Sequence, residues 1–94
     1  SALFEPIDTP FGRIGLSICY DLRFPEVARF AATHGCQLLI NPAAWVDGRL
    51  KAEQWRTLLS ARAIENEMFV AGLSRVDKGY IGQSAVFGHR PFGD

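Results

Sequence analysis

The beginning of the chain has the pattern of two short strands joined by a turn. A first strand is predicted over Ala2–Asp8, and a second over Arg13–Ile18, where β-branched and other apolar residues form a run. Pro10 and Gly12 lie between these segments and favour a turn. A β-hairpin is therefore expected here.

Two later segments have the periodicity of a helix. In the first, positions of one face recur at i, i+3, i+4 and i+7, at Val27, Phe30, Ala31 and His34. This period predicts a helix over Pro25–His34, with proline at its first position and Gly35 just beyond its end. A second helix is predicted over Leu50–Asn66.

The inner face of the second predicted helix carries two polar residues among apolar ones, in the series Trp55, Leu58, Leu59, Arg62, Ala63 and Asn66. An unpaired buried charge is costly, so Arg62 is expected to find a partner, either Glu65 or a carboxylate elsewhere such as Glu26. We interpret the segment Arg62–Asn66 as structural rather than catalytic.

Strands and loops complete the pattern. Three further strands are predicted over Cys36–Ile40, Met68–Leu73 and Gln83–Phe87. Ser74–Tyr80 is predicted to be a polar loop, and Gly88–Asp94 an irregular end. The alternation of strands and helices predicts an α/β layered domain with its helices on one face of a sheet. Asn41–Gly48 is predicted to be a loop at the carboxyl end of a strand, the usual place for binding groups in such domains, and Trp45 is a candidate pocket wall.

Cys19 lies where the second predicted strand gives way to the first predicted helix. Few residues separate it from Pro25, so its thiol is expected on a sharp strand-to-helix turn, near backbone N–H groups and a positive helix end that favour thiolate. The N–H of Tyr20 would be placed to serve as an oxyanion donor. The alternative is one more buried cysteine, since free cysteine is among the most buried residue types.

Composition narrows the possible partners. The 94 residues suffice for at most one small domain, 48% of them are apolar, and ten Lys and Arg balance ten Asp and Glu. The basic residues are scattered, so nothing favours nucleic acid or an acidic membrane as a partner.

No apolar run approaches the roughly 20 residues needed to cross a bilayer, and a cytoplasmic location is expected. Cys19 and Cys36 are expected to be reduced, and no spacing indicates a metal site.

Three stretches, in order and with natural spacing, resemble successive signatures of the nitrilase superfamily, the carbon–nitrogen hydrolases: Phe11–Glu26, Gly35–Trp45 and Ala61–Asn66. The Nit-type amidase branch, which includes the ω-amidases, is most similar. The resemblance implies a partial α-β-β-α sandwich, about half of the full domain, with residues 1–94 as a C-terminal-half fragment. It also implies a small amide substrate, no metal or organic cofactor, and a homodimer formed through helices.

In the mechanism that the resemblance implies, a thiolate at Cys19 attacks the amide carbon and forms a thioester. The N–H of Tyr20 and a lysine hold the oxyanion, and a glutamate activates the water that hydrolyses the thioester.

The resemblance also assigns roles by position. Arg23 would lie beside the pocket mouth or anchor the loop after the nucleophile. Its charge suits either a substrate carboxylate or an ion pair with Glu26. Ala43, Ala44 and Trp45 match a pocket-lining loop of the family. The residues that match positions bracing the family's fold are Glu26, Arg62, Glu65 and Asn66.

One part of the family pattern is missing. The catalytic glutamate and lysine of the family lie upstream of the cysteine motif, and only seven residues precede Asp8 here. The only lysines, Lys51 and Lys78, do not match the position of the catalytic lysine. Glu5 does not match the position of the catalytic glutamate. A histidine base is not expected, because His34 lies about 15 Å from Cys19 along the predicted helix and the other histidine, residue 89, falls in the irregular end.

Two functional hypotheses follow from this gap. The first is part of an amidase that is inactive without its remaining segments. The second is a truncated, non-catalytic α/β module that serves as an interaction or structural protein.

Overall fold

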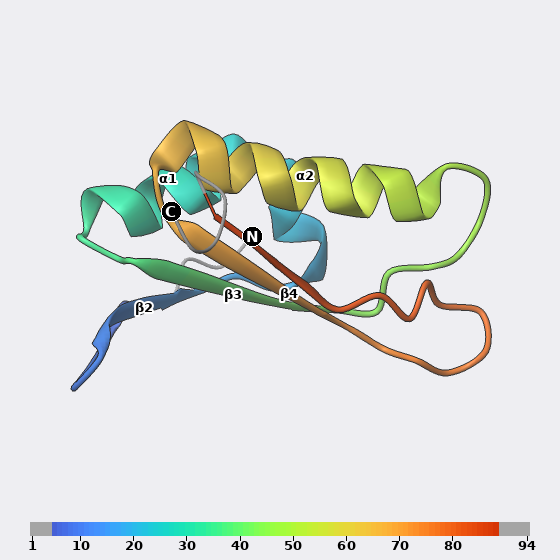
Figure 1. The fold of residues 1–94 in the computed structure, drawn as a ribbon, viewed down its shortest axis with the longest axis horizontal. Helices are drawn as coiled ribbons and strands as arrows, with labels where there is room; N and C mark the ends of the chain where they lie inside the picture. The colour runs from blue at the N-terminus through green and yellow to red at the C-terminus, as the bar shows by residue number, and fades with distance from the viewer. Residues whose placement is uncertain (1–4, 89–94) are drawn as a thin grey trace.

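The predicted hairpin forms the first two strands of a five-stranded sheet (Figure 1). In the computed structural model, which describes residues 5–88, the strand order is β1-β2-β3-β4-β5. The strands are β1 (Ile7–Thr9), β2 (Gly12–Leu16), β3 (Leu38–Ala43), β4 (Phe69–Ser74) and β5 (Ala85–Phe87). The Thr9 hydroxyl accepts a hydrogen bond from the Phe11 N–H at 3.2 Å and donates one to the Gly12 carbonyl at 2.7 Å, which closes the hairpin turn.

The centre of the sheet is parallel and its edges are antiparallel. β2, β3 and β4 run parallel, whereas β1 pairs antiparallel with β2 and β5 with β4. A short 3-10 helix, η1 (Cys19–Arg23), and α1 (Pro25–Thr33) connect β2 to β3, and α2 (Lys51–Asn66) connects β3 to β4. Both α-helices cover the same face of the sheet (Figure 1), so the predicted α/β layering is confirmed.

Local chemistry explains where the helices begin and end. Pro25 occupies the start of α1, where its missing N–H costs no helical hydrogen bond. After α1, Gly35 takes a left-handed φ of +81° and the Cys36 N–H donates to the Ala31 carbonyl at 3.0 Å, which turns the chain into β3. Glu67 ends α2 in the same left-handed region, with a φ of +51°.

The core lies between the two helices and the sheet. Its most deeply buried apolar side chains include Leu22, Leu39, Trp55, Leu59, Ala63 and Val70. α2 approaches β4 closely at Gly72, where a Cβ atom would lie 2.5 Å from Trp55 and 2.7 Å from Leu59. Glycine is therefore required for this close approach of helix and strand.

The opposite face of the sheet is apolar, and no element within residues 5–88 covers it (Figure 1). The strand register aligns its side chains in two adjoining rows, Ile14-Leu38-Phe69 and Leu16-Ile40-Ala71-Val86. These side chains are half-buried or exposed, whereas their neighbours Leu39 and Val70 face the helices and are buried. The two layers correspond to one α-β half of the expected α-β-β-α sandwich.

The segment Asn41–Gly48 is not wholly a loop, and that prediction is wrong at its beginning. β3 continues through Ala43 and pairs with β4 along its whole length. Because the pairing of β2 with β3 ends at Leu16 opposite Ile40, Pro42 needs no ladder donor on the side of β2.

Other strand boundaries also differ from the predicted ones. The strands predicted over 2–8, 13–18, 36–40, 68–73 and 83–87 are observed as Ile7–Thr9, Gly12–Leu16, Leu38–Ala43, Phe69–Ser74 and Ala85–Phe87. The second strand ends early because Ser17 and Ile18 already lead into η1, which the sequence pattern did not predict. Of the predicted irregular end, Gly88 has no regular structure, and His89 lies outside the described residues, as do residues 2–4 of the first predicted strand.

Candidate active site

Cys19 occupies a strained turn at the carboxyl end of β2. Its φ is +47°, in the left-handed region that residues with a Cβ rarely adopt, and η1 begins at this residue. Ile18 before it is extended, with φ −127° and ψ 125°. The predicted strand-to-helix turn is therefore present, although the first helical element is η1 and α1 follows only at Pro25. Such a backbone conformation costs on the order of 1–3 kcal/mol and persists only where surrounding contacts hold it.

A polar pair beneath the turn joins β2 to β3. The Asn41 side chain donates from Nδ2 to the Ser17 Oγ at 2.7 Å, and both residues are almost completely buried. The Ser17 N–H donates to the Ile40 carbonyl at 3.0 Å, which continues the sheet by one hydrogen bond. Among the described residues, the Asn41 Oδ1 has no hydrogen-bond partner. These contacts fix the backbone two residues before Cys19.

Cys19 lines a hollow at the carboxyl ends of the three parallel strands. This hollow of about 540 Å³ is lined by Ile18, Cys19, Pro42, Ala43, Ala44, Leu73, Ser74 and Arg75. Ala43 and Ala44, which the sequence predicted to be pocket-lining, therefore lie beside Cys19. Of the described residues that line the hollow, only Arg75 is charged; it forms an ion pair with Asp77, and its guanidinium carbon lies 4.8 Å from the centroid of the Tyr80 ring.

Trp45, the predicted pocket wall, does not line this hollow as the described residues form it. Its side chain is buried in the core, where its ring centroid lies 5.2 Å from that of Trp55. The indole N–H donates to the Lys51 carbonyl at 3.0 Å. A large apolar ring gains more from this burial, with its one donor satisfied, than from an exposed position in an open hollow.

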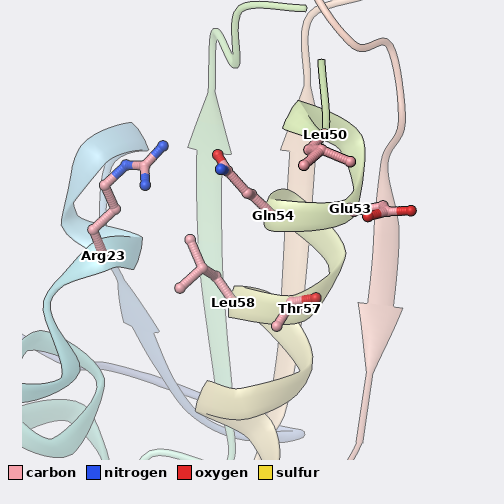
Figure 2. Close-up of a pocket in the computed structure, with 6 residues that line it drawn as sticks. All are labelled: Arg23, Leu50, Glu53, Gln54, Thr57 and Leu58. Atoms are coloured by element: carbon pink, nitrogen blue, oxygen red, sulfur yellow. The ribbon is translucent and has the colours of Figure 1, made fainter. Parts of the chain in front are cut away.

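Arg23 lies apart from the Cys19 hollow, at a second hollow between η1 and α2. Figure 2 shows its side chain reaching across toward Gln54, and the hollow of about 330 Å³ is also lined by Leu50, Glu53, Thr57 and Leu58. The guanidinium carbon lies 4.7 Å from the centroid of the Trp45 ring and 5.3 Å from that of Tyr20. Its Nε is buried and has no acceptor within the described residues.

The predicted supporting residues divide into a connected group and one isolated member. Arg62 is buried, forms an ion pair with Glu65 at 3.1 Å, and donates from Nε to the Leu22 carbonyl at 3.1 Å. Asn66 donates to the Arg62 carbonyl at 2.9 Å. Of the two partners left open for Arg62, the structure selects Glu65, because Glu26 is exposed and forms no ion pair with it in the described part of the chain.

The second cysteine has a different environment. Cys36 is buried near the amino end of β3, and burial raises the pKa of its thiol above the ordinary value, while the nearby Arg13 charge opposes this rise only in part. Both cysteines are free thiols. Within residues 5–88, no group of three or more His, Cys, Asp or Glu side chains is placed to hold a metal ion, and no helix has the length and apolarity to cross a membrane.

Comparison with known proteins identifies the family. Residues 1–90 match the carbon-nitrogen hydrolase family. The chain belongs to this family. It is a member of the nitrilase superfamily and of its Nit branch, as the sequence motifs indicated.

Individual relatives of this carbon-nitrogen hydrolase chain are amidases. Deaminated glutathione amidase of Escherichia coli O157:H7 is 44% identical over 81 residues, which cover 86% of this chain and 30% of that protein. Omega-amidase NIT2 of Homo sapiens is 44% identical over 71 residues, or 76% of this chain and 25% of that protein. The chain thus spans less than half the length of the curated relatives that it matches.

A solved structure adds a chemical observation. A mutant of the amidase from Nesterenkonia sp. AN1 aligns with a TM-score of 0.80 and 30% identity, over 95% of this chain and 35% of that one. In that structure the acetamide moiety of fluoroacetamide is covalently added at the active-site cysteine.

Sequence reasoning missed three polar residues around the turn of this hydrolase chain. Asp21 caps the turn, and its spacing from Ile18 is that of a capping residue, a signal present in the sequence. Ser17 and Asn41 are 24 residues apart, so no local pattern reveals their hydrogen bond.

Proposed function

We propose that this chain carries the nucleophilic part of an amidase, which hydrolyses the non-peptide C–N bond of a small amide through a thioester at Cys19. The observation that carries the proposal is the left-handed turn that places Cys19 at the hollow at the carboxyl ends of β2, β3 and β4. The amidase names of the relatives and the covalently modified cysteine of the Nesterenkonia amidase support it.

The first step forms a carbon–sulfur bond. The Cys19 thiolate attacks the amide carbon, and the carbonyl π electrons move to oxygen to give a tetrahedral oxyanion. Tyr20 is at the second position of η1, where a backbone N–H has no partner inside the helix, so it can donate to this oxyanion. Collapse of the intermediate re-forms the carbonyl and breaks the C–N bond, while a general acid gives the nitrogen the proton with which it leaves as ammonia or an amine.

The second step regenerates the thiol. Water loses a proton to a general base and attacks the thioester carbon, which releases the carboxylic acid and returns the sulfur as thiolate. Among the described residues, the Cys19 hollow is lined by no carboxylate and no lysine. We therefore propose that the glutamate and lysine of the family come from segments other than these residues, and that the 94-residue chain alone does not turn over.

Space for the substrate is the contribution of β3. Ala43, the last residue of β3, and Ala44 after it both line the hollow, and we propose that a small acyl group lies beside them.

We further propose that the whole protein forms a homodimer through its helices, as the family resemblance implies. On the outer side of α2, Ile64 is 59% exposed and is a candidate contact, and light scattering of the Ile64→Asp variant tests this.

The experiment uses the full-length protein that contains this chain. Ammonia release from small aliphatic amides is measured for the natural sequence, for Cys19→Ala and for the matched control Cys36→Ala. We expect complete loss for the first variant and full activity for the control. Mass spectrometry during turnover should find the acyl group on the peptide that contains Cys19. Amide hydrolysis that survives Cys19→Ala would overturn the assignment.

The alternative, a non-catalytic interaction module, has one observation in its favour. The uncovered face of the sheet is apolar in every row, and such surfaces mark interaction sites. The same amide assay distinguishes the two functions, because a module of this kind would be inactive in the full-length protein as well.

A further inference from the structure

We propose that Asp21 is a positioning residue for Cys19: its buried carboxylate holds the turn that keeps the nucleophile in the left-handed conformation. This inference rests on the proposed role of Cys19 as the nucleophile. It adds a residue whose side chain acts on the backbone of the turn and not on the substrate.

Two hydrogen bonds between the same pair of residues enclose Cys19 and Tyr20. The Asp21 N–H donates to the Ile18 carbonyl at 2.9 Å, and the Ile18 N–H donates to the Asp21 Oδ2 at 3.3 Å. Ile18 is extended, and the next residue has a φ of +47°. The chain must reverse direction within this four-residue ring, and the left-handed residue at position 19 provides the reversal.

Asp21 differs from an ordinary helix-capping residue because its side chain is buried and not exposed to solvent. The residue is only 8% exposed, and within residues 5–88 it forms no ion pair. Burying an unpaired carboxylate is unfavourable, so the side chain is costly for folding alone. An alanine would leave the Ile18 N–H without this acceptor, and an asparagine would offer a neutral and therefore weaker one.

The position of the turn has a chemical consequence. The sulfur of Cys19 and the N–H of Tyr20 must both face the same substrate carbonyl, and rotation of one backbone angle moves them relative to each other. If the carboxylate is removed, residue 19 can relax toward a negative φ, which misaligns the attack. Small misplacements of this kind reduce turnover strongly while substrate binding by the rest of the pocket is retained.

Kinetics of the full-length amidase provide the first test. Asp21→Ala is compared with Asp21→Asn and with Asp47→Ala, a matched control at an exposed aspartate that caps its own loop through the Gly48 N–H. We expect kcat to fall about 100-fold for Asp21→Ala and about 10-fold for Asp21→Asn, with KM nearly unchanged. The control should keep its kcat. If Asp21→Ala does not fold, Asp21→Asn still decides the question, because natural kcat in that variant would overturn the role of the charge.

A stability comparison distinguishes positioning from simple bracing. Glycine tolerates a positive φ and alanine does not, so Cys19→Gly should melt at a higher temperature than Cys19→Ala. In the Asp21→Ala background this difference should shrink, because the turn is no longer held. An unchanged difference would show that Asp21 does not set the conformation of residue 19, and would overturn the proposal. Full turnover by Cys19→Ala would instead overturn the proposed function, while the stability comparison would still decide the role of Asp21 in the turn.

Discussion

Arg62 donates from its buried Nε to the carbonyl of Leu22 at 3.1 Å, across 40 residues of sequence. Leu22 lies in η1, the short helix that begins at Cys19, so α2 braces the turn that carries the thiol. Glu65 orients the guanidinium from one turn further along α2. The motif that the sequence indicated to be structural is therefore linked by a direct contact to the helix of the candidate nucleophile.

Replacing Arg62 by methionine should destabilise the protein. The substitution leaves the Leu22 carbonyl without its donor and Glu65 without its partner, and a lost buried hydrogen bond costs about 1–3 kcal/mol. Urea unfolding of the full-length protein measures this loss. Arg49→Met is the control, because Arg49 is exposed and lies before α2. Equal unfolding midpoints for Arg62→Met and the natural protein would contradict the brace.

Gly72→Ala should weaken the packing of α2 on β4. The added methyl group would lie 2.5 Å from Trp55 and 2.7 Å from Leu59, in a part of the core where both side chains are completely buried. Overpacking of this kind costs about 1–3 kcal/mol. Thermal unfolding checks it against Gly48→Ala, where the nearest atom belongs to the flexible Lys51 side chain at 3.3 Å. A variant as stable as the control would mean that the helix can move away from the strand.

Much of the layered fold was predictable, because local patterns specify it. Pro10 and Gly12 indicated the hairpin, and the helical period of the segment after Pro25 indicated α1. The family resemblance placed Ala43 and Ala44 in a pocket-lining loop, and the parallel pairing of β2 with β3 explains why they lie near Cys19.

What remained hidden depends on contacts between distant residues or on backbone angles. Trp45 could face either a pocket or the core, and only the position of Trp55 decides for the core. The +47° φ of Cys19 has no signature in the residue type, since cysteine carries a Cβ and is not expected in that region. The local sequence assigns Asn41 to a loop, because its hydrogen-bond partner Ser17 lies 24 residues away and no local pattern reveals that contact.

The two cysteines should differ in reactivity. Burial raises the pKa of the Cys36 thiol, so at neutral pH it remains protonated and shielded, whereas Cys19 lines an open hollow. We expect iodoacetamide to modify Cys19 first and Cys36 only when the protein unfolds. Peptide mapping after timed alkylation measures both rates. Equal rates at the two sites in the folded protein would contradict this difference in environment.

The same burial gives a signed dependence of stability on pH. A thiol whose pKa is raised on folding contributes stability that is complete below the pKa of the unfolded chain, about 8.5, and is lost as pH rises through the folded value. Stability should therefore fall on the alkaline side, and Cys36→Ala should fall less steeply over that interval. Urea unfolding at a series of pH values from neutral upward measures the two slopes. Parallel slopes would show that Cys36 does not titrate differently in the folded and unfolded states.

The uncovered face of the sheet should make the 94-residue chain bind hydrophobic dyes and self-associate when it is prepared alone. Val86 and Leu73 are 51% and 50% exposed there, beside the half-buried Ile40. Exposed apolar area of this extent binds hydrophobic dyes and promotes association. We expect strong fluorescence from an anilinonaphthalene dye and concentration-dependent light scattering, both reduced by Val86→Lys. Val76→Lys is the matched control, because Val76 is 81% exposed but follows the end of β4 and belongs to no strand. If the control reduced dye binding as much as Val86→Lys, the effect would come from any exposed apolar residue and not from the uncovered face of the sheet.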